Sequence, residues 1–184
     1  AGDVDTLRWI APRIARLAVQ LLGQGVQSRQ VTDLISRLND VLTVRLLQLE
    51  AVRHGVDLAH ACWLALGSEG RSEQTIATDQ DNALILSDGA DAGSRETYAR
   101  FARSVNESLD ACGFPLCRGG IMAGSPGGCA TLSEWRSRFA RWMDRGAPED
   151  VLQASVYLDF RAIAGGAHLA SRLRDDVVGR ARVT

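Results

Sequence analysis

Two aspartates stand two positions apart in the segment "TDQDNALIL". Asp79 and Asp81 come directly before an apolar run that is typical of a buried strand. Side chains alternate between the two faces of an extended chain, so both carboxylates point the same way, with Cα atoms roughly 6.5 to 7 Å apart. Two carboxylates at this spacing repel each other unless a cation lies between them. We expect that cation to be Mg²⁺ (or Mn²⁺), because Mg²⁺ takes one or two carboxylates together with phosphate oxygens and water.

A glycine-serine pair precedes the aspartates, at the end of an earlier apolar run. Gly67 lets the backbone approach a ligand closely, and the first N–H groups of the short helical stretch that follows favour an anion. Ser68 adds a hydroxyl donor, and Arg71 is the nearest side chain able to bind phosphate oxygens in a bidentate manner. Each feature alone is common in ordinary turns, and we interpret Glu69 and Glu73 as supporting or structural charges.

All 21 basic residues of this chain are arginine. The absence of lysine excludes a Walker lysine and a Schiff-base lysine, so phosphate must be held by backbone N–H groups, arginine or metal. The net charge of -1 argues against a surface built to bind nucleic acid. An apolar share of 46% over 184 residues supports a packed core. The four cysteines form no C-x-x-C pair, and Cys62 is expected to be a buried thiol.

The first part of the chain is predicted to be a pair of long helices. Apolar residues recur three and four apart over residues 7–21 and again over 31–52, with a break at Gly23 and Gly25. Such stripes serve as a connector to another domain, as a dimer seam, or simply as the faces that pack on the body of the domain. The last of these is the commonest outcome.

The period then changes to that of strands. Residues 61–66 and 81–87 are apolar on both faces, which is typical of central strands covered on both sides. A helix is expected over 95–112, and a third strand over 114–123. The acidic pair and the glycine-serine pair therefore lie at adjacent strand ends.

The chain is predicted to be helical again beyond the segment "GSPGG". Thr131 and Glu134 have the spacing of a capping box. Pro148 is expected to open another helix, and a last helix is expected over 168–182. We divide the chain into an N-terminal helical segment, a core and a C-terminal helical segment, at residues 1–56, 57–124 and 125–184.

The segment "GSEGRSEQTIATDQDNALI" resembles the nucleotidyltransferase fold of the DNA polymerase beta superfamily. It looks most like bacterial nucleotidyltransferases that are often fused to CBS and cyclic-nucleotide-binding domains and that are related to PII uridylyltransferase and glutamine synthetase adenylyltransferase. The resemblance continues through "ACGFPLCRGGIMA", "LSEWRSRFARW" and "DFRAI", so it covers about residues 64–163. It implies an α+β fold with a small mixed sheet and flanking helices.

The resemblance also implies site residues and an activity. By position, Gly67 and Ser68 match the phosphate-binding pair, and Asp79 and Asp81 match the metal-binding carboxylates. The implied reaction moves a nucleoside monophosphate from an NTP such as ATP or UTP to an acceptor and releases pyrophosphate, with metal ions assisting the in-line displacement. By analogy with the better known relatives, the acceptor is expected to be a protein.

One part of the superfamily pattern is missing. Many members carry a third carboxylate on a later strand, whereas "FPLCRGGIMA" contains no acid. Asp159 falls in an apolar stripe of the helix expected after Pro148, so it is a candidate for the third acid. The favoured alternative is an ion pair of Asp159 with an arginine such as Arg118 or Arg161, because a buried charge is normally paired. Arg118 is in turn a candidate for phosphate binding or for the partner of Asp159.

Three hypotheses follow. The first is a Mg²⁺-dependent nucleotidyltransferase in a signalling or regulatory setting. The second, which the missing third acid motivates, is a nucleotide-sensing module with little or no catalysis, and the third is a helical interaction scaffold. The expected partners are an NTP, a protein acceptor and fused or interacting regulatory domains, with oligomerisation through the N-terminal helices left open. The first residues lack the pattern of a leader peptide and no apolar run reaches membrane-spanning length, so we expect a cytoplasmic location.

Overall fold

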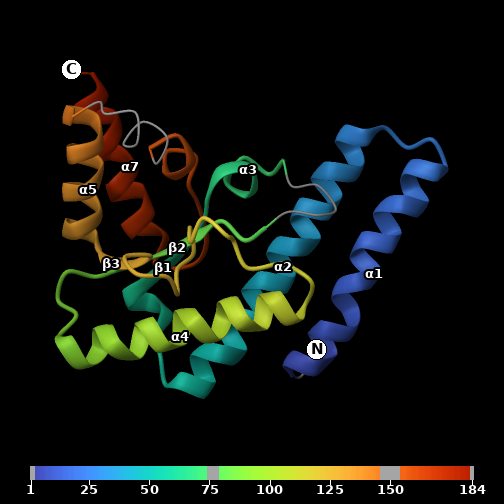
Figure 1. Ribbon diagram of the computed structural model, residues 1–184, viewed down its shortest axis with the longest axis horizontal. Coiled ribbons are helices and arrows are strands. Elements are labelled where there is room, and N and C mark those ends of the chain that lie inside the picture. Colours follow the sequence, from blue (N-terminus) through green and yellow to red (C-terminus); the bar gives the residue numbers. More distant parts are fainter. Residues whose placement is uncertain (1–2, 74–78, 146–153, 183–184) are drawn as a thin grey trace.

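A four-stranded mixed sheet lies between two layers of helices in the part of the chain that is described (Figure 1). The computed structural model describes residues 3–73, 79–145 and 154–182. The strand order is β3-β2-β1-β4, with β1 antiparallel to both of its neighbours and β2 parallel to β3. The strands are β1 (Ala61–Ala65), β2 (Asn82–Leu86), β3 (Cys129–Thr131) and β4 (Arg161–Gly165). The expected α+β class with a small mixed sheet is confirmed.

Most of the expected helices are present at nearly the expected positions. They are α1 (Val4–Gly23), α2 (Ser28–His54), the short α3 (Gly67–Gly70), α4 (Ala92–Ala111), α5 (Leu132–Arg145) and α7 (Ala167–Ala181). The capping box before α5 is confirmed: the Thr131 N–H donates to the Glu134 carboxylate at 2.8 Å, and the Glu134 N–H donates to the Thr131 hydroxyl at 3.3 Å. Among the described helices, none combines the length and the apolar character needed to cross a membrane.

The two faces of the sheet belong to two separate cores. Trp63 and Leu84 face α2 and α4, where the ring of Trp63 meets Phe101 of α4 edge to face at 6.5 Å. Cys62 and Ile85 face the opposite side, where they pack with residues of α5 and α7. This alternation explains why β1 and β2 are apolar throughout, as the sequence predicted for strands that are covered on both sides. Cys62 is the buried thiol that was expected.

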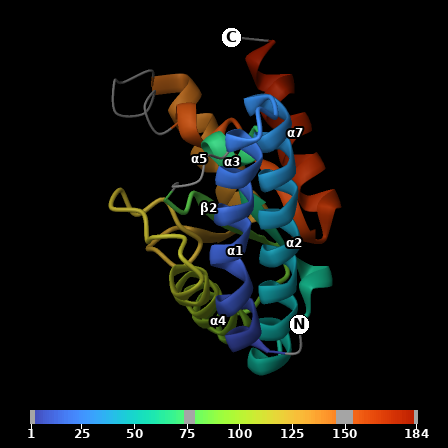
Figure 2. The same ribbon diagram turned by 90° about the vertical axis from the view of Figure 1, so that its right-hand side faces the viewer.

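The N-terminal helices form a hairpin against one side of the molecule. Figure 1 and Figure 2 both show α1 running alongside α2. Ala18 of α1 packs with Val31 and Ile35 of α2, and α2 continues toward the sheet, where Leu46 and Leu47 join the core beneath β1. The two expected helices are therefore confirmed, and they pack on each other and on the body.

The third strand was predicted in the wrong place. Residues 114–123 form turns, and the strand that pairs with β2 is β3, further along the chain. The segment makes two isolated backbone bonds to the chain entering β2, because the carbonyls of Pro115 and Ile121 accept from the N–H groups of Gln80 and Asn82 at 3.0 and 3.1 Å. Its next N–H groups donate to side chains: that of Ala123 to Asn82 and that of Gly124 to Asn106, both at 2.8 Å. The segment thus lies beside β2 without forming the regular ladder that the apolar pattern suggested.

The surroundings of Asp159 also differ from the prediction. The helix expected to begin at Pro148 falls mostly outside the described residues, and the described helical turn at 154–157 ends before Asp159. Asp159 lies in a bend that leads directly into β4, which pairs with β1. The segment that we expected to be helical beyond residue 125 therefore contributes two strands, because pairing at both edges of the sheet overrides the local helical spacing.

Candidate active site

The two aspartates lie where the chain enters β2. Asp79 is exposed and Asp81 is half-buried. The residues that alternate with them are buried on the other side: Gln80 and Asn82 both bond to the side chain of Asn106 on α4, at 2.8 and 2.9 Å. This buried amide network fixes the backbone, so that the two carboxylates share the opposite face, as their spacing predicts.

The environment of Asp81 favours a positive ion. Burial raises the pKa of the Asp81 carboxyl, and the neighbouring charge of Asp79 raises it further, whereas a hydrogen bond from the Cys117 thiol lowers it. A raised pKa means that the charged carboxylate form is destabilised, and a nearby cation would stabilise it. No group of three or more metal-ligating side chains occurs within the described ranges. A metal here would therefore take Asp79 and Asp81 and complete its shell with phosphate oxygens and water, which suits Mg²⁺.

The glycine-serine turn meets Asp81 directly. Gly67 has a positive φ of 53°, and a Cβ added to it would lie 3.4 Å from a carboxylate oxygen of Asp81. The backbones are joined as well, because the N–H of Leu66 donates to the carbonyl of Asp81 at 2.9 Å. The first N–H groups of α3 have no partner within the helix, and the Ser68 hydroxyl makes no hydrogen bond with the described residues. The structure thus brings hydrogen-bond donors for phosphate to the edge of the carboxylate pair.

A second set of contacts holds α3 in place from behind. The guanidinium of Arg161 donates to the carbonyls of Glu69 at 3.0 Å and Gly70 at 3.2 Å. The same guanidinium is held by both carboxylate oxygens of Asp40 on α2, at 2.8 and 3.1 Å. Farther along the loop, the hydroxyl of Ser36 on α2 donates to the Ser72 carbonyl at 3.0 Å. We call residues 67–72 the candidate phosphate loop, and we call Asp40, Arg161 and Ser36 the α2 clamp, because they tie this loop to α2.

Glu69 lies in α3, between the α2 clamp and the aspartate pair, and the pKa of its carboxyl is raised. Burial, the nearby charge of Asp40 and that of Asp81 raise the pKa of Glu69 to about 8, although the charge of Arg161 opposes the shift. Burial and two neighbouring carboxylates thus disfavour the charged form of Glu69. Its supporting role stays a prediction.

Arg71 and Asp159, two of the residues singled out in the sequence, are partners. A guanidinium nitrogen of Arg71 lies 2.5 Å from the Asp159 carboxylate, and its Nε donates to Glu73 at 2.8 Å. Asp159 is therefore in an ion pair, as the favoured alternative held, but with Arg71 and not with Arg118 or Arg161. The Asp159 side chain is 42% exposed, so it is not the buried acid that the helical spacing suggested.

Arg118 stands apart from these pairs. Its side chain is exposed in the 114–124 loop, next to Cys117, and within the described residues it forms no ion pair. It is not the partner of Asp159, and its role in phosphate binding stays a prediction.

Three residues near Asp81 were not singled out from the sequence. Burial raises the pKa of the Tyr157 phenol, the charge of Arg138 lowers it, and the charge of Asp81 raises it further. Arg138 itself lies over the ring of Trp135 at 4.2 Å. A sequence signal for Arg138 was present, because it follows Trp135 by three positions and so shares a helix face with it. Tyr157 and Cys117 carried no such signal, since they reach Asp81 only through the tertiary fold.

The comparisons with known proteins support a nucleotide-transferring family. The model of the family described as "Putative nucleotidyltransferase DUF294" matches residues 12–149, which include α2, α3, the aspartate pair and all of α5. No match is found among curated proteins.

Proposed function

The chain belongs to this family of nucleotidyltransferases, and we propose that it moves a nucleoside monophosphate from an NTP to a protein acceptor. The reaction would use Mg²⁺ (or Mn²⁺), release pyrophosphate and serve a signalling or regulatory purpose. The observation that carries this proposal is the closeness of the Asp81 carboxylate to the backbone of Gly67, 3.4 Å from where its Cβ would be. Donors for phosphate and ligands for a metal thus share one strand-end site.

Each residue of the site has a chemical role that its surroundings support. Asp79 and Asp81 would hold the ion, which would offset both the burial and the Asp79 charge that raise the pKa of Asp81. The N–H groups at Gly67 and the hydroxyl of Ser68 would bind phosphate oxygens and orient them toward the carboxylate pair. When bound, the ion would neutralise charge on the phosphates and polarise the phosphorus for attack.

A nucleotide-sensing module with weak or no catalysis is the second candidate. Neither β3 nor β4 carries an acidic residue, and Asp159, the acid just before β4, is engaged with Arg71 at 2.5 Å. A third carboxylate that would help to activate the acceptor is therefore not evident among the described residues. Binding of an NTP without transfer would satisfy this candidate.

Calorimetry with ATP or UTP in the presence of Mg²⁺ tests the site. We expect the double variant Asp79→Asn with Asp81→Asn to bind at least about 10-fold more weakly than wild type, since contacts to charged groups each contribute about 1.5–3 kcal/mol. The matched control removes two exposed carboxylates from α1 and α2, Asp5→Asn with Asp33→Asn, and should bind as wild type does. Equal affinity of the two double variants would rule out the metal assignment.

Pyrophosphate release separates the two candidates. If the wild type binds an NTP and releases pyrophosphate with at least one protein acceptor, and the Asp79→Asn with Asp81→Asn variant does not, the enzyme is supported. If binding is present and release is absent with every acceptor tried, the sensing module is supported. A wild type that binds no nucleotide would contradict both and favour an interaction scaffold.

A further inference from the structure

A cleft with an excess of positive charge lies beside the edge strand β3. It has a volume of about 540 Å³ and is bounded by β3, the loop before it, the start of α4 and one side of α5. Three arginines line it, accompanied by a single carboxylate. They are Arg95, Arg138 and Arg141, with Glu134. Only one of the three positive charges is therefore balanced by an acid that lines the cleft.

The arginines differ in how they are engaged. Arg95 is bound to both carboxylate oxygens of Glu134, at 2.6 and 2.9 Å. Arg138 is half-buried, rests on the ring of Trp135 and donates to the carbonyl of Gly127 at 2.7 Å, and no acidic side chain of the described residues forms an ion pair with it. Burial and the nearby charge of Arg141 lower the pKa of Arg138, whereas the charge of Glu134 opposes the shift. A guanidinium has five N–H donors, so Arg138 retains several for a ligand.

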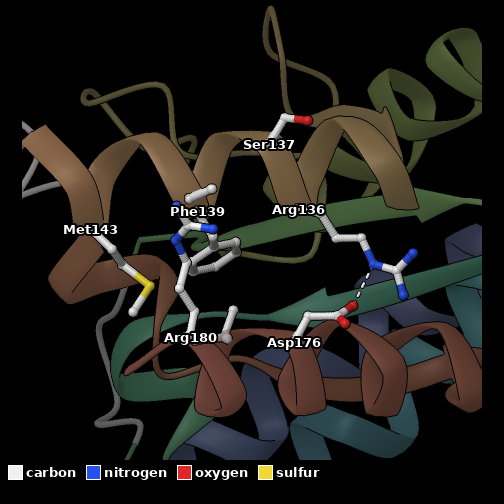
Figure 3. Close-up of a pocket in the computed structure, with 8 residues that line it drawn as sticks. Arg136, Ser137, Phe139, Met143, Asp176 and Arg180 are labelled. Atoms are coloured by element: carbon white, nitrogen blue, oxygen red, sulfur yellow. Dashed lines mark hydrogen bonds and ion pairs between the residues drawn. The ribbon is translucent and has the colours of Figure 1, made fainter. Parts of the chain in front are cut away.

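The other side of the same helix provides a contrast. A cleft of about 360 Å³ between α5 and α7 is also lined by arginines, whose side chains are drawn in Figure 3. There Arg136 is paired with Asp176, and Arg180 is paired with Asp144 at 2.6 Å. Those charges are satisfied within the protein. The cleft beside β3 is different because Arg138 and Arg141 face it without such partners among the described residues.

The charged cleft is close to the candidate active site. The ring of Tyr157 packs on Trp135, with 5.4 Å between the ring centroids. The charges of Arg138 and Asp81 both shift the pKa of the Tyr157 phenol, in opposite directions. Arg138 also contacts Gly127, in the segment that leads into β3 beside β2. Tyr157 is therefore the side chain through which the cleft and the candidate active site are connected.

We propose that Arg138 and Arg141 form a phosphate-binding subsite in the cleft beside β3. Phosphate fits the observations because it carries up to two negative charges and several acceptor oxygens, which match the forked donors of arginine. The chain has no lysine, so arginine is the only side chain of permanent positive charge that can do this work. The inference rests on the proposed nucleotidyl transfer for its biological meaning, and the phosphate belongs either to the nucleotide itself or to a phosphorylated acceptor.

The test uses inorganic pyrophosphate as the probe, in EDTA so that the aspartate pair and its metal do not contribute. Calorimetry should show that Arg138→Ala weakens pyrophosphate binding at least about 10-fold, as expected for the loss of charged hydrogen bonds. Arg138→Lys should be intermediate because it keeps the charge and loses the fork. The matched control is Arg136→Ala, which removes an arginine of the same helix from the opposite cleft and should leave the affinity within about twofold, the usual range for a distant surface change.

Two further measurements keep the test decisive. Arg141 is exposed, so Arg141→Ala should fold normally and still weaken pyrophosphate binding severalfold, even if Arg138→Ala disturbs the stack on Trp135. Competition with ATP and Mg²⁺ identifies the source: displacement of pyrophosphate by ATP, with weaker ATP binding in Arg138→Ala, assigns the subsite to the nucleotide. Simultaneous binding of both assigns it to a phosphorylated acceptor.

Failure of the subsite is distinguishable from failure of the proposed function. If wild type binds ATP with Mg²⁺ through its aspartates, yet does not bind pyrophosphate or binds it equally well in Arg138→Ala and Arg141→Ala, the subsite is refuted and the proposed function stands. If pyrophosphate binding depends on Arg138 but no NTP binds, the subsite stands and the proposed function is refuted.

Discussion

Replacing Asp40 by alanine is expected to loosen the candidate phosphate loop from a distance. Asp40 is on α2 and touches neither Gly67 nor Ser68, but it holds Arg161 with two hydrogen bonds of 2.8 and 3.1 Å. Arg161 in turn donates to the carbonyls of Glu69 and Gly70. Without Asp40, the guanidinium of Arg161 loses the partner that fixes its position, so its hydrogen bonds to the α3 carbonyls weaken.

The exposure of the pair sets the size of the effect. The side chains of Arg161 and Asp40 are 32% and 26% exposed, so they are neither fully buried nor fully hydrated. Removing one partner of a buried pair costs about 3–5 kcal/mol, whereas an exposed pair contributes about 0.2–1 kcal/mol. We therefore expect Asp40→Ala to lower the free energy of unfolding by about 2 kcal/mol, an intermediate value between those limits. For a domain of this size that corresponds to a fall in Tm of about 4–8 °C.

Thermal and urea unfolding followed by circular dichroism measure this change. The matched control is Asp144→Ala, which breaks the pair with Arg180, where the side chains are 53% and 44% exposed. The control should lose no more than about 1 kcal/mol. Hydrogen exchange of the backbone amides from Glu69 to Arg71 should speed up in Asp40→Ala and stay unchanged in Asp144→Ala. If Asp40→Ala is no less stable than Asp144→Ala and its α3 amides exchange as in wild type, the idea of an α2 clamp is wrong.

Three more predictions concern the same region. Because the pKa of Glu69 is about 8 in the folded chain against an ordinary value of 4.5, the native state holds a proton that the unfolded state has released between those values. The free energy of unfolding should therefore fall as pH rises through this window, by at most about 1.4 kcal/mol per pH unit. Urea unfolding measured over this pH range should show a shallower dependence of the free energy on pH for Glu69→Gln than for wild type. An identical pH dependence in the two proteins would contradict the raised pKa of Glu69. Gly70→Ala would place a Cβ 1.7 Å from the Asp159 carbonyl and should lower the free energy of unfolding by at least about 1–3 kcal/mol. The control Gly89→Ala has open space around it and should be nearly neutral in the same urea assay. Equal stability of the two variants would refute the close packing at Gly70. Asn106→Ala removes three buried hydrogen bonds and should cost about 3 kcal/mol in thermal unfolding, with a loss under about 1 kcal/mol counting against the network.

The strands that carry the candidate site could be predicted because their signal is local. Residues 61–65 and 82–86 are apolar on both faces, which in a chain of this size indicates strands covered by helices on both sides. The placement of Asp79 and Asp81 on one face follows from the two-residue repeat of extended chain, and Gly67 stands where a positive φ is needed. The strands, the shared face of the two aspartates and the glycine position depend only on residues that are close in sequence, so they can be predicted from the sequence.

The errors arose where a local pattern had two tertiary solutions. The apolar residues of the 114–123 segment suited a strand, but the segment makes only isolated backbone bonds to the chain entering β2, and the side chains of Asn82 and Asn106 accept from the N–H groups that follow. The spacing around Asp159 suited a helix, but the open edge of β1 offers pairing to residues 161–165. In both cases the competition was decided by a partner distant in sequence, which a periodicity cannot reveal.

The sequence by itself determined the class of chemistry, whereas the tertiary structure decided which charges are available for it. The lack of lysine, the paired aspartates and the glycine-serine turn are properties of the chain, and they restrict phosphate binding to arginine, backbone and metal. Which arginines can serve depends on their partners in space: Arg71 is engaged with Asp159, and Arg161 is held by Asp40, 121 positions away. Arg138 forms no ion pair within the described part of the chain, although a backbone carbonyl and an aromatic ring hold it in its cleft. The physical reason is that the cost of burying a charge is settled by whatever the fold places beside it, and that neighbour is rarely adjacent in sequence.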